Sequence, residues 1–64
     1  MKLRYLKDVL YSVRGEVQWA IVYDYSNNVD LTPECSIEYA IENFGDRFVH
    51  RISASNNLII ISVI

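Results

Sequence analysis

The feature that most constrains this chain is its closing segment, LIIISVI, at residues 58–64. A strand with one wet face alternates apolar and polar residues, because successive side chains point to opposite faces of a sheet. This segment is apolar at both parities, so it predicts a strand buried on both sides in a chain of only 64 residues. The two parities are Leu58, Ile60, Ser62 and Ile64, and Ile59, Ile61 and Val63.

A chain this short has a thin core, since it buries only about 60% of the surface that its unfolded form exposes. Small folds commonly need a disulfide, a metal or a partner subunit for stability. Cys35 is the only cysteine and His50 the only histidine, which excludes an intrachain disulfide and the usual Cys/His zinc sites. We therefore expect no metal and no cofactor, and predict a homo-oligomer, a dimer or larger.

The predicted oligomer interface is one parity of the closing strand, Ile59, Ile61 and Val63, with a second copy covering it. Two alternatives remain open. A loop of the same chain could cover a central strand, or the closing strand could lie at a sheet edge and pair with another chain, since no charge or proline protects it.

Hydrophobic periodicity predicts six elements in one domain, residues 1–64. Apolar residues at helical spacing predict a helix over 3–13, ended by Gly15, and Thr32-Pro33 is typical of the start of a second helix, ended by Gly45. The predicted buried stripe of the second helix is Ile37, Ala40, Ile41 and Phe44. The predicted strands are 16–25, 29–31, 47–54 and 58–64, with turns at 26–28 and 55–57.

The order α-β-β-α-β-β predicts an α+β fold: a small two-layer domain with a mostly antiparallel sheet and helices on one face. Two short helices can cover only one face of that sheet. The second face of the closing strand would need another cover, which could also extend over the Trp19, Tyr23 and Tyr25 row. The sequence does not decide which face of the first strand points inward.

Charge and composition narrow the partners. Net charge is −2, with a balance of +3 over residues 1–14 and −5 over residues 15–64. The chain lacks the overall basic balance of duplex nucleic-acid binders, and its apolar runs are too short to span a membrane. We expect a soluble protein in a reducing, cytoplasmic compartment, where a lone cysteine is common.

Catalytic residues are few. Cys35 would lie in the first turn of the second helix, where the helix dipole favours a thiolate, and His50 is the one candidate general base. Against this, the two lie on distant elements, and both residues suit structural roles. No glycine-rich phosphate loop or nucleophile motif is present, so we predict that the chain is not an enzyme.

Binding residues are more evident. Arg47 and Arg51 share one parity of a predicted strand, so two guanidinium groups could hold one phosphate or carboxylate. Trp19, Tyr23 and Tyr25 share a face and could stack on a nucleobase or form an interface hot spot. The alternative is that the rings pack under the helices and the arginines pair with Asp24, Asp30 or Asp46.

The segments MKLRYLKDVL, AIVYDY and EYAIENFGDRFVHRISASNNLIIISVI resemble small accessory proteins encoded by phages and other mobile elements of Firmicutes. The ending of that pattern corresponds to Val49, Ile52, Ala54, Leu58 and Ile60, and Ser62 departs from it. The resemblance implies an accessory or anti-defence role in the host cytoplasm. It provides no catalytic or ligand residues.

Two functions follow as hypotheses. The first is a non-enzymatic protein that sequesters a nucleotide-derived immune signal at an oligomer interface, or a host defence protein, by stoichiometric binding. The second is a protein–protein interaction module that docks on a host or phage protein without a small ligand.

Overall fold

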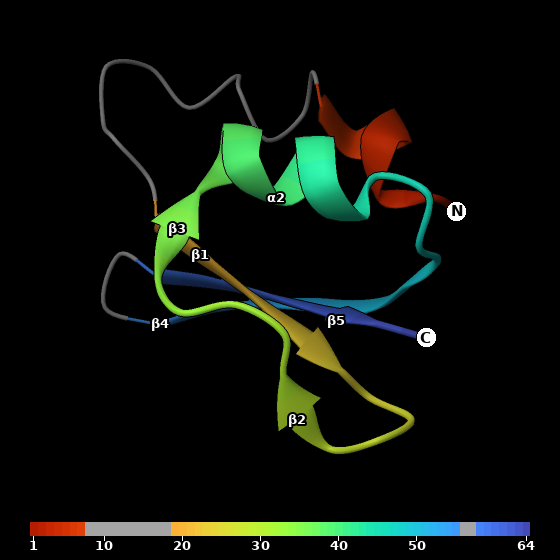
Figure 1. Cartoon of the computed structure of the whole chain (residues 1–64), viewed down its shortest axis with the longest axis vertical. Helices are drawn as coiled ribbons and strands as arrows, with labels where there is room; N and C mark the ends of the chain where they lie inside the picture. Colours follow the sequence, from red (N-terminus) through yellow and green to blue (C-terminus); the bar gives the residue numbers. More distant parts are fainter. Residues whose placement is uncertain (8–18, 56–57) are drawn as a thin grey trace.

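A computed structural model describes residues 1–7, 19–55 and 58–64 of the chain (Figure 1). In this part, a mixed five-stranded sheet lies against α2 and the short 3₁₀ helix η1, which confirms the α+β class. The elements are η1 (Leu3–Leu6), β1 (Trp19–Asp24), β2 (Val29–Asp30), β3 (Cys35–Ser36), α2 (Ile37–Phe44), β4 (Val49–Ser55) and β5 (Leu58–Val63).

The sheet has the order β2-β1-β5-β4, and β3 also pairs with β1. The central pair, β1 and β5, is parallel, and the other pairings are antiparallel. β4 and β5 pair as an antiparallel hairpin, which agrees with the turn predicted at 55–57, whereas the parallel central pair was not predicted. Because β5 lies between β1 and β4, it is not an edge strand, which excludes the alternative of edge pairing by the closing strand.

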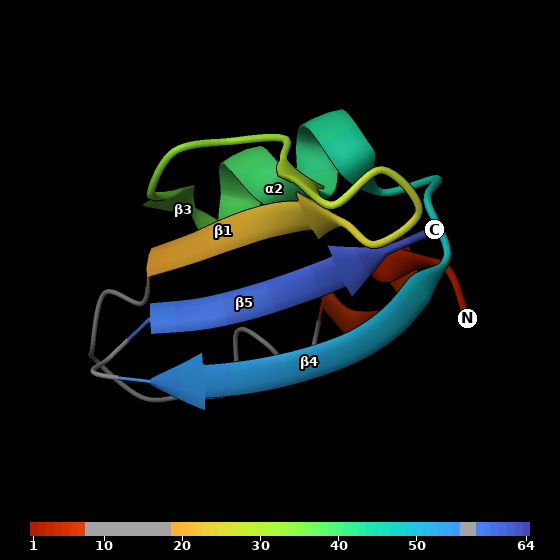
Figure 2. The same cartoon turned by 90° about the horizontal axis from the view of Figure 1, so that it is seen from below.

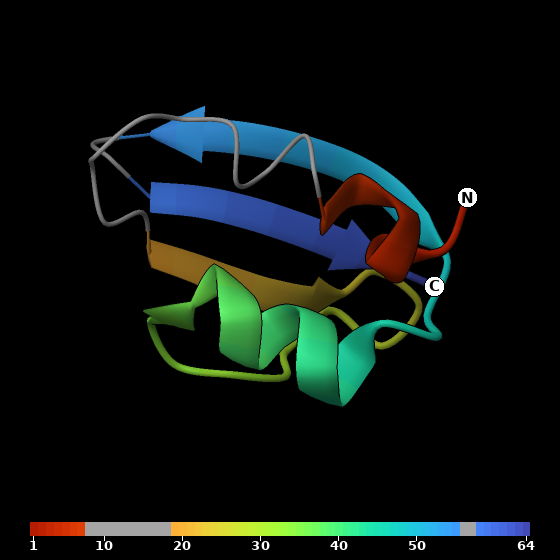
Figure 3. The same cartoon turned by 90° about the horizontal axis from the view of Figure 1, so that it is seen from above.

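Both helical elements lie on the same face of the sheet (Figures 1 and 3). The side chains between the helical elements and the sheet form the buried core: Leu3, Ala20, Val22, Ile37, Ala40, Ile61 and Val63. Two of these residues are alanines, one on β1 and one on α2, and both have no exposed surface. Small residues at these positions let the helix come close to the sheet.

Helix α2 starts later than predicted. Ser36, not Thr32, is the N-cap, and its hydroxyl accepts a hydrogen bond from the Tyr39 N–H at 3.1 Å. The helix ends at Gly45 as predicted, but that residue has φ −60° and ψ −24°, so it is not left-handed. Close approach explains the glycine better, because a Cβ there would lie 2.5 Å from the Ile41 carbonyl oxygen.

Thr32 has a different role, at the edge of β1. Its hydroxyl, which is buried, accepts a hydrogen bond from the Val22 N–H at 3.0 Å, and the Leu31 N–H donates to the Val22 carbonyl at 2.7 Å. The segment from β2 to β3 therefore follows β1 along its edge. Between the residues of β1 that pair with β2 and those that pair with β3, the Thr32 hydroxyl takes the place of a backbone acceptor for the Val22 N–H.

Other predictions are confirmed in part. The period-two pattern of residues 19–24 is strand β1, and the Asn-containing turn after it has Asn28 at φ 53°. The buried stripe of α2 is as predicted, with Ile37 and Ala40 buried and Ile41 and Phe44 packed against the core. Of the first predicted helix, residues 8–13 lie outside the described part of the chain, as do Gly15, residues 16–18 and the turn residues 56–57.

Candidate functional site

The sheet face opposite the helices carries a cluster of large apolar side chains. On β1 the parity of Ala20 and Val22 is buried under α2, so Trp19, Ile21 and Tyr23 point to the opposite side. We call this cluster the open face. Its members are Trp19, Ile21, Tyr23, Tyr25, Leu58 and Ile60, and Figure 2 views the sheet from this side.

The strand register places these side chains in rows across the sheet. Trp19 lies beside Leu58 and Ile21 lies beside Ile60, so aromatic and aliphatic side chains are neighbours on adjacent strands. Trp19 is 47% exposed and Tyr25 is 52% exposed. The alternative prediction, that these rings pack under the helices, is therefore wrong.

A third row of paired residues crosses the four strands β2, β1, β5 and β4. Asp30 of β2 pairs with Tyr23 of β1, Tyr23 with Ser62 of β5, and Ser62 with Arg51 of β4. Paired residues point to the same face of a sheet, so this row has an acidic residue at one edge and a basic residue at the other. Asp30 and Arg51 are both exposed.

A bulge in β4 determines which face Arg51 occupies. Val49 pairs with Val63 and Arg51 pairs with Ser62, so a step of two residues along β4 matches a step of one residue along β5. Val49 is consequently on the helix side and Arg51 on the open side, although a regular strand would put them on the same face. The residue between them, His50, stacks on Tyr25 with ring centroids 4.0 Å apart, across β5.

The predicted pair of arginines is not formed. Arg47 precedes β4, and its Nη2 lies 3.5 Å from Asp24 Oδ2 while its Nε donates to the Ile64 carbonyl at 3.3 Å. The alternative prediction of a pairing with Asp24 is thus confirmed for Arg47. Arg51 lies beyond the bulge, on the open side of β4.

Asp24 is itself a structural residue. It closes the turn after β1, because its carboxylate accepts hydrogen bonds from the Asn27 side chain at 2.8 Å and from the Ser26 N–H at 3.0 Å. The pKa of Asp24 lies below its ordinary value of 3.8, and the largest cause is the hydrogen bond from the Asn27 side chain. The backbone N–H groups of Asn27 and Ser26 and the charge of Arg47 also lower this pKa, whereas burial raises it. The Asp24–Arg47 pair therefore holds the sheet end together.

The predicted oligomer interface at Ile59, Ile61 and Val63 has to be corrected. Ile61 and Val63 have no exposed surface and belong to the core under α2, and Ile59 packs against that core. The helices of the same chain cover this parity, so it is not accessible to a second subunit. The parity that faces away from the helices is that of Leu58 and Ile60, which the sequence alone did not assign to a binding surface.

Cys35 does not lie in a helical turn. It belongs to β3, one residue before the N-cap, so the helix-dipole argument for a reactive thiol is wrong. Its Sγ is half-buried and lies 3.3 Å from the Ala20 carbonyl oxygen and 3.6 Å from Thr32 Oγ1. His50 is on β4, at the opposite edge of the sheet from β3, so these two groups are not brought together.

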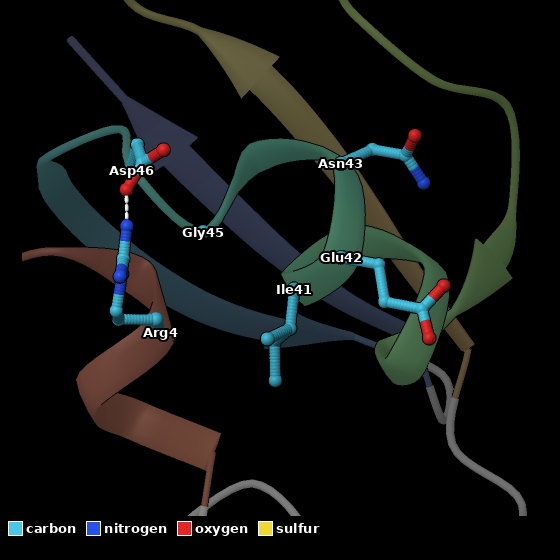
Figure 4. Close-up of a pocket in the computed structure, with 6 residues that line it drawn as sticks. All are labelled: Arg4, Ile41, Glu42, Asn43, Gly45 and Asp46. Carbon is cyan, nitrogen blue, oxygen red and sulfur yellow. Dashed lines mark ion pairs between the residues drawn. The ribbon is translucent and has the colours of Figure 1, made fainter.

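Among the described residues, two open hollows lie on the helix side. One of about 280 Å³ is lined by Arg4, Ile41, Glu42, Asn43, Gly45 and Asp46, and Figure 4 shows the Arg4–Asp46 ion pair at its rim. The other, of about 330 Å³, is lined by Lys7, Glu38, Ile41 and Glu42. Neither contains a residue of the open face or either predicted ligand-binding arginine.

Within residues 1–7, 19–55 and 58–64, no group of three His, Cys, Asp or Glu side chains is placed to hold a metal ion. The same residues contain no helix long and apolar enough to cross a membrane.

The chain matches no protein-family model, no curated protein and no solved structure.

Proposed function

We propose that this chain is a small non-enzymatic binding protein whose open face docks on a protein surface. The observation that carries the proposal is the outward parity of β1, which places Trp19 beside Leu58 and Ile21 beside Ile60 on the side away from the helices. Tyr23 follows on the same parity, and Tyr25, just after β1, is 52% exposed. Aromatic side chains flanked by aliphatic ones are the usual composition of an interface hot spot. The resemblance to phage accessory proteins agrees with such a role and stays a prediction.

Protein docking is favoured over sequestration of a nucleotide. A nucleotide site needs cationic groups that converge on a phosphate. Arg47 is engaged with Asp24, whereas the bulge turns Arg51 to the open side, so the two arginines do not converge. The open face is an extended sheet surface, and the two hollows described above lie on the other side of the sheet. Extended surfaces suit macromolecular partners.

The proposal is tested by site-specific photocrosslinking in the native cells. Benzoylphenylalanine replaces Trp19 in one variant, Tyr25 in a second and Tyr39 in a control, because Tyr39 is 50% exposed but lies on α2. We expect protein adducts from positions 19 and 25 and few from position 39. Equal labelling from all three positions, or no protein adduct from positions 19 and 25, would contradict docking by the open face.

Native mass spectrometry of the purified chain provides a second test. A bound species of nucleotide mass that is lost in Arg51→Ala would favour small-molecule sequestration and overturn the proposal. We expect no such species.

A further inference from the structure

The open face carries opposite charges at its two edges, and these charges have no partner within the described chain. Neither Asp30 nor Arg51 forms an ion pair among residues 1–7, 19–55 and 58–64. Resting on the proposed function of this face, we propose that its occupant is a second copy of the chain, stacked face to face about a two-fold axis parallel to the strands.

The register fixes where the two charges lie. Asp30, Tyr23, Ser62 and Arg51 follow one another across the sheet in a single row. Adjacent strands are about 4.8 Å apart, so the two charged residues are separated by about 14 Å across the row. The middle of the row lies between Tyr23 and Ser62, between the central strands β1 and β5.

Two identical faces can stack about a two-fold axis that runs either along the strands or across them. An axis along the strands, through the middle of the row, places Asp30 opposite Arg51 of the partner subunit, and it forms this pair twice. An axis across the strands places each charge opposite its own copy, which is repulsive. The charge pattern therefore selects the axis along the strands.

The same axis also matches side-chain sizes. It puts Tyr23 opposite Ser62 of the partner subunit, a large ring over a small residue, and Trp19 opposite Leu58 of the partner subunit. Stacked sheets lie about 10 Å apart, a gap that such side chains fill by interdigitation. A large residue over a small one is what interdigitation requires, so packing and charge favour the same arrangement.

The size of the face predicts the strength of the dimer. Three strands of six or seven residues and the short β2 give a planar footprint of about 300–400 Å² for each copy. A standard stable interface buries about 800 Å² for each partner, so this dimer lies in the weak, transient class. We expect reversible association that is visible only across a concentration range of about 1 μM to 1 mM.

The test is sedimentation equilibrium of the full chain and four variants over that range. Asp30→Lys places a lysine opposite the partner's Arg51, and Arg51→Glu places two acids opposite each other, so each is expected to weaken dimerisation about tenfold. The double variant, Asp30→Lys with Arg51→Glu, exchanges the two charges and should restore the wild-type dissociation constant. Glu42→Lys is the matched control, since it changes net charge by the same amount as Asp30→Lys but lies on α2.

Two results would overturn the inference. One is a monomer at every concentration, and the other is a dimer that both single variants leave unchanged. The photocrosslinking experiment separates this failure from failure of the proposed function. An adduct of another protein at position 19, with a monomeric chain, would retain protein docking and reject self-association. If the open face docks on proteins and its occupant is a second copy, we expect an adduct of twice the chain mass at positions 19 and 25.

Discussion

Replacing Thr32 by valine tests how the edge of β1 is stabilised. Valine has nearly the same shape, but it removes the oxygen that accepts the Val22 N–H at 3.0 Å. That N–H belongs to a residue with no exposed surface, so it is left without a partner in the core. A buried donor without a partner costs about 1–3 kcal/mol, and we expect Thr32→Val to lose this amount of unfolding free energy.

The loss is large for a chain of this size. In a domain of 60–100 residues, 1 kcal/mol corresponds to a shift of about 4–8 °C in the melting temperature, so the expected decrease is about 5–20 °C. Thermal and urea unfolding followed by circular dichroism measure it. The protein should be at low micromolar concentration, because self-association would add to the apparent stability.

Thr32→Ser is the matched control. Serine keeps the accepting oxygen and removes one methyl group, which costs about 0.8 kcal/mol or less. We therefore expect Thr32→Ser to be more stable than Thr32→Val. If the valine variant were as stable as the wild type, or the serine variant lost as much, the hydroxyl would not be completing the edge of β1 and the reasoning would be refuted.

Three further predictions address the core, the end of α2 and the dependence of stability on pH in the acidic range. Ile61→Ala removes a fully buried side chain and should cost about 2–5 kcal/mol in urea unfolding, whereas Ile60→Ala, on the open face, should cost clearly less; equal losses would contradict the assigned parity. Gly45→Ala would place a Cβ 2.5 Å from the Ile41 carbonyl oxygen, so we expect a loss of about 1–3 kcal/mol, and an unchanged melting temperature would exclude this crowding. The folded state lowers the pKa of Asp24 below 3.8, so its contribution is complete above that pH and is lost as the pH falls through the folded value; unfolding between pH 5 and pH 2 should show a weaker pH dependence in Asp24→Asn, and an identical dependence would show that this carboxylate is not responsible.

Periodicity predicted the elements that contact the core through a regular pattern. The strand over residues 19–24 and the stripe of α2 follow directly from spacing, because each side chain's face depends only on its position in the element. The same reasoning identified two parities in the closing strand. It could not decide which parity the helix covers, since both are apolar.

The deciding residues are on β1. Ala20 and Val22 are small enough to lie under a close helix, while Trp19 and Tyr23 are bulky, so packing puts the aromatic parity outside. Asp24 obscured this pattern in the sequence, because a charged residue on a core-facing parity is normally taken as a sign of solvent. The turn after β1 resolves the conflict by supplying N–H donors to that carboxylate.

The start of α2 was misplaced for a related reason. Thr32 and Pro33 have the local chemistry of a helix start, and so does Ser36. The choice between them depends on a tertiary contact, because the Val22 N–H, ten residues away in the chain, needs the Thr32 hydroxyl. Local capping preference cannot include that demand.

The bulge at His50 has the largest consequence for the candidate site. Without it, Val49 and Arg51 would share a face, and Val49 and Ile52 would lie on opposite faces. One extra residue lets both Val49 and Ile52 lie on the helix side, in register with Val63 and Ile61, and it turns Arg51 outward at the same time. Of these two residues, Val49 packs against the core, whereas Ile52 is 41% exposed. The bulge therefore brings Val49 to the core, and the charged edge of the open face, on which the proposed dimer depends, is a geometric consequence of the same bulge.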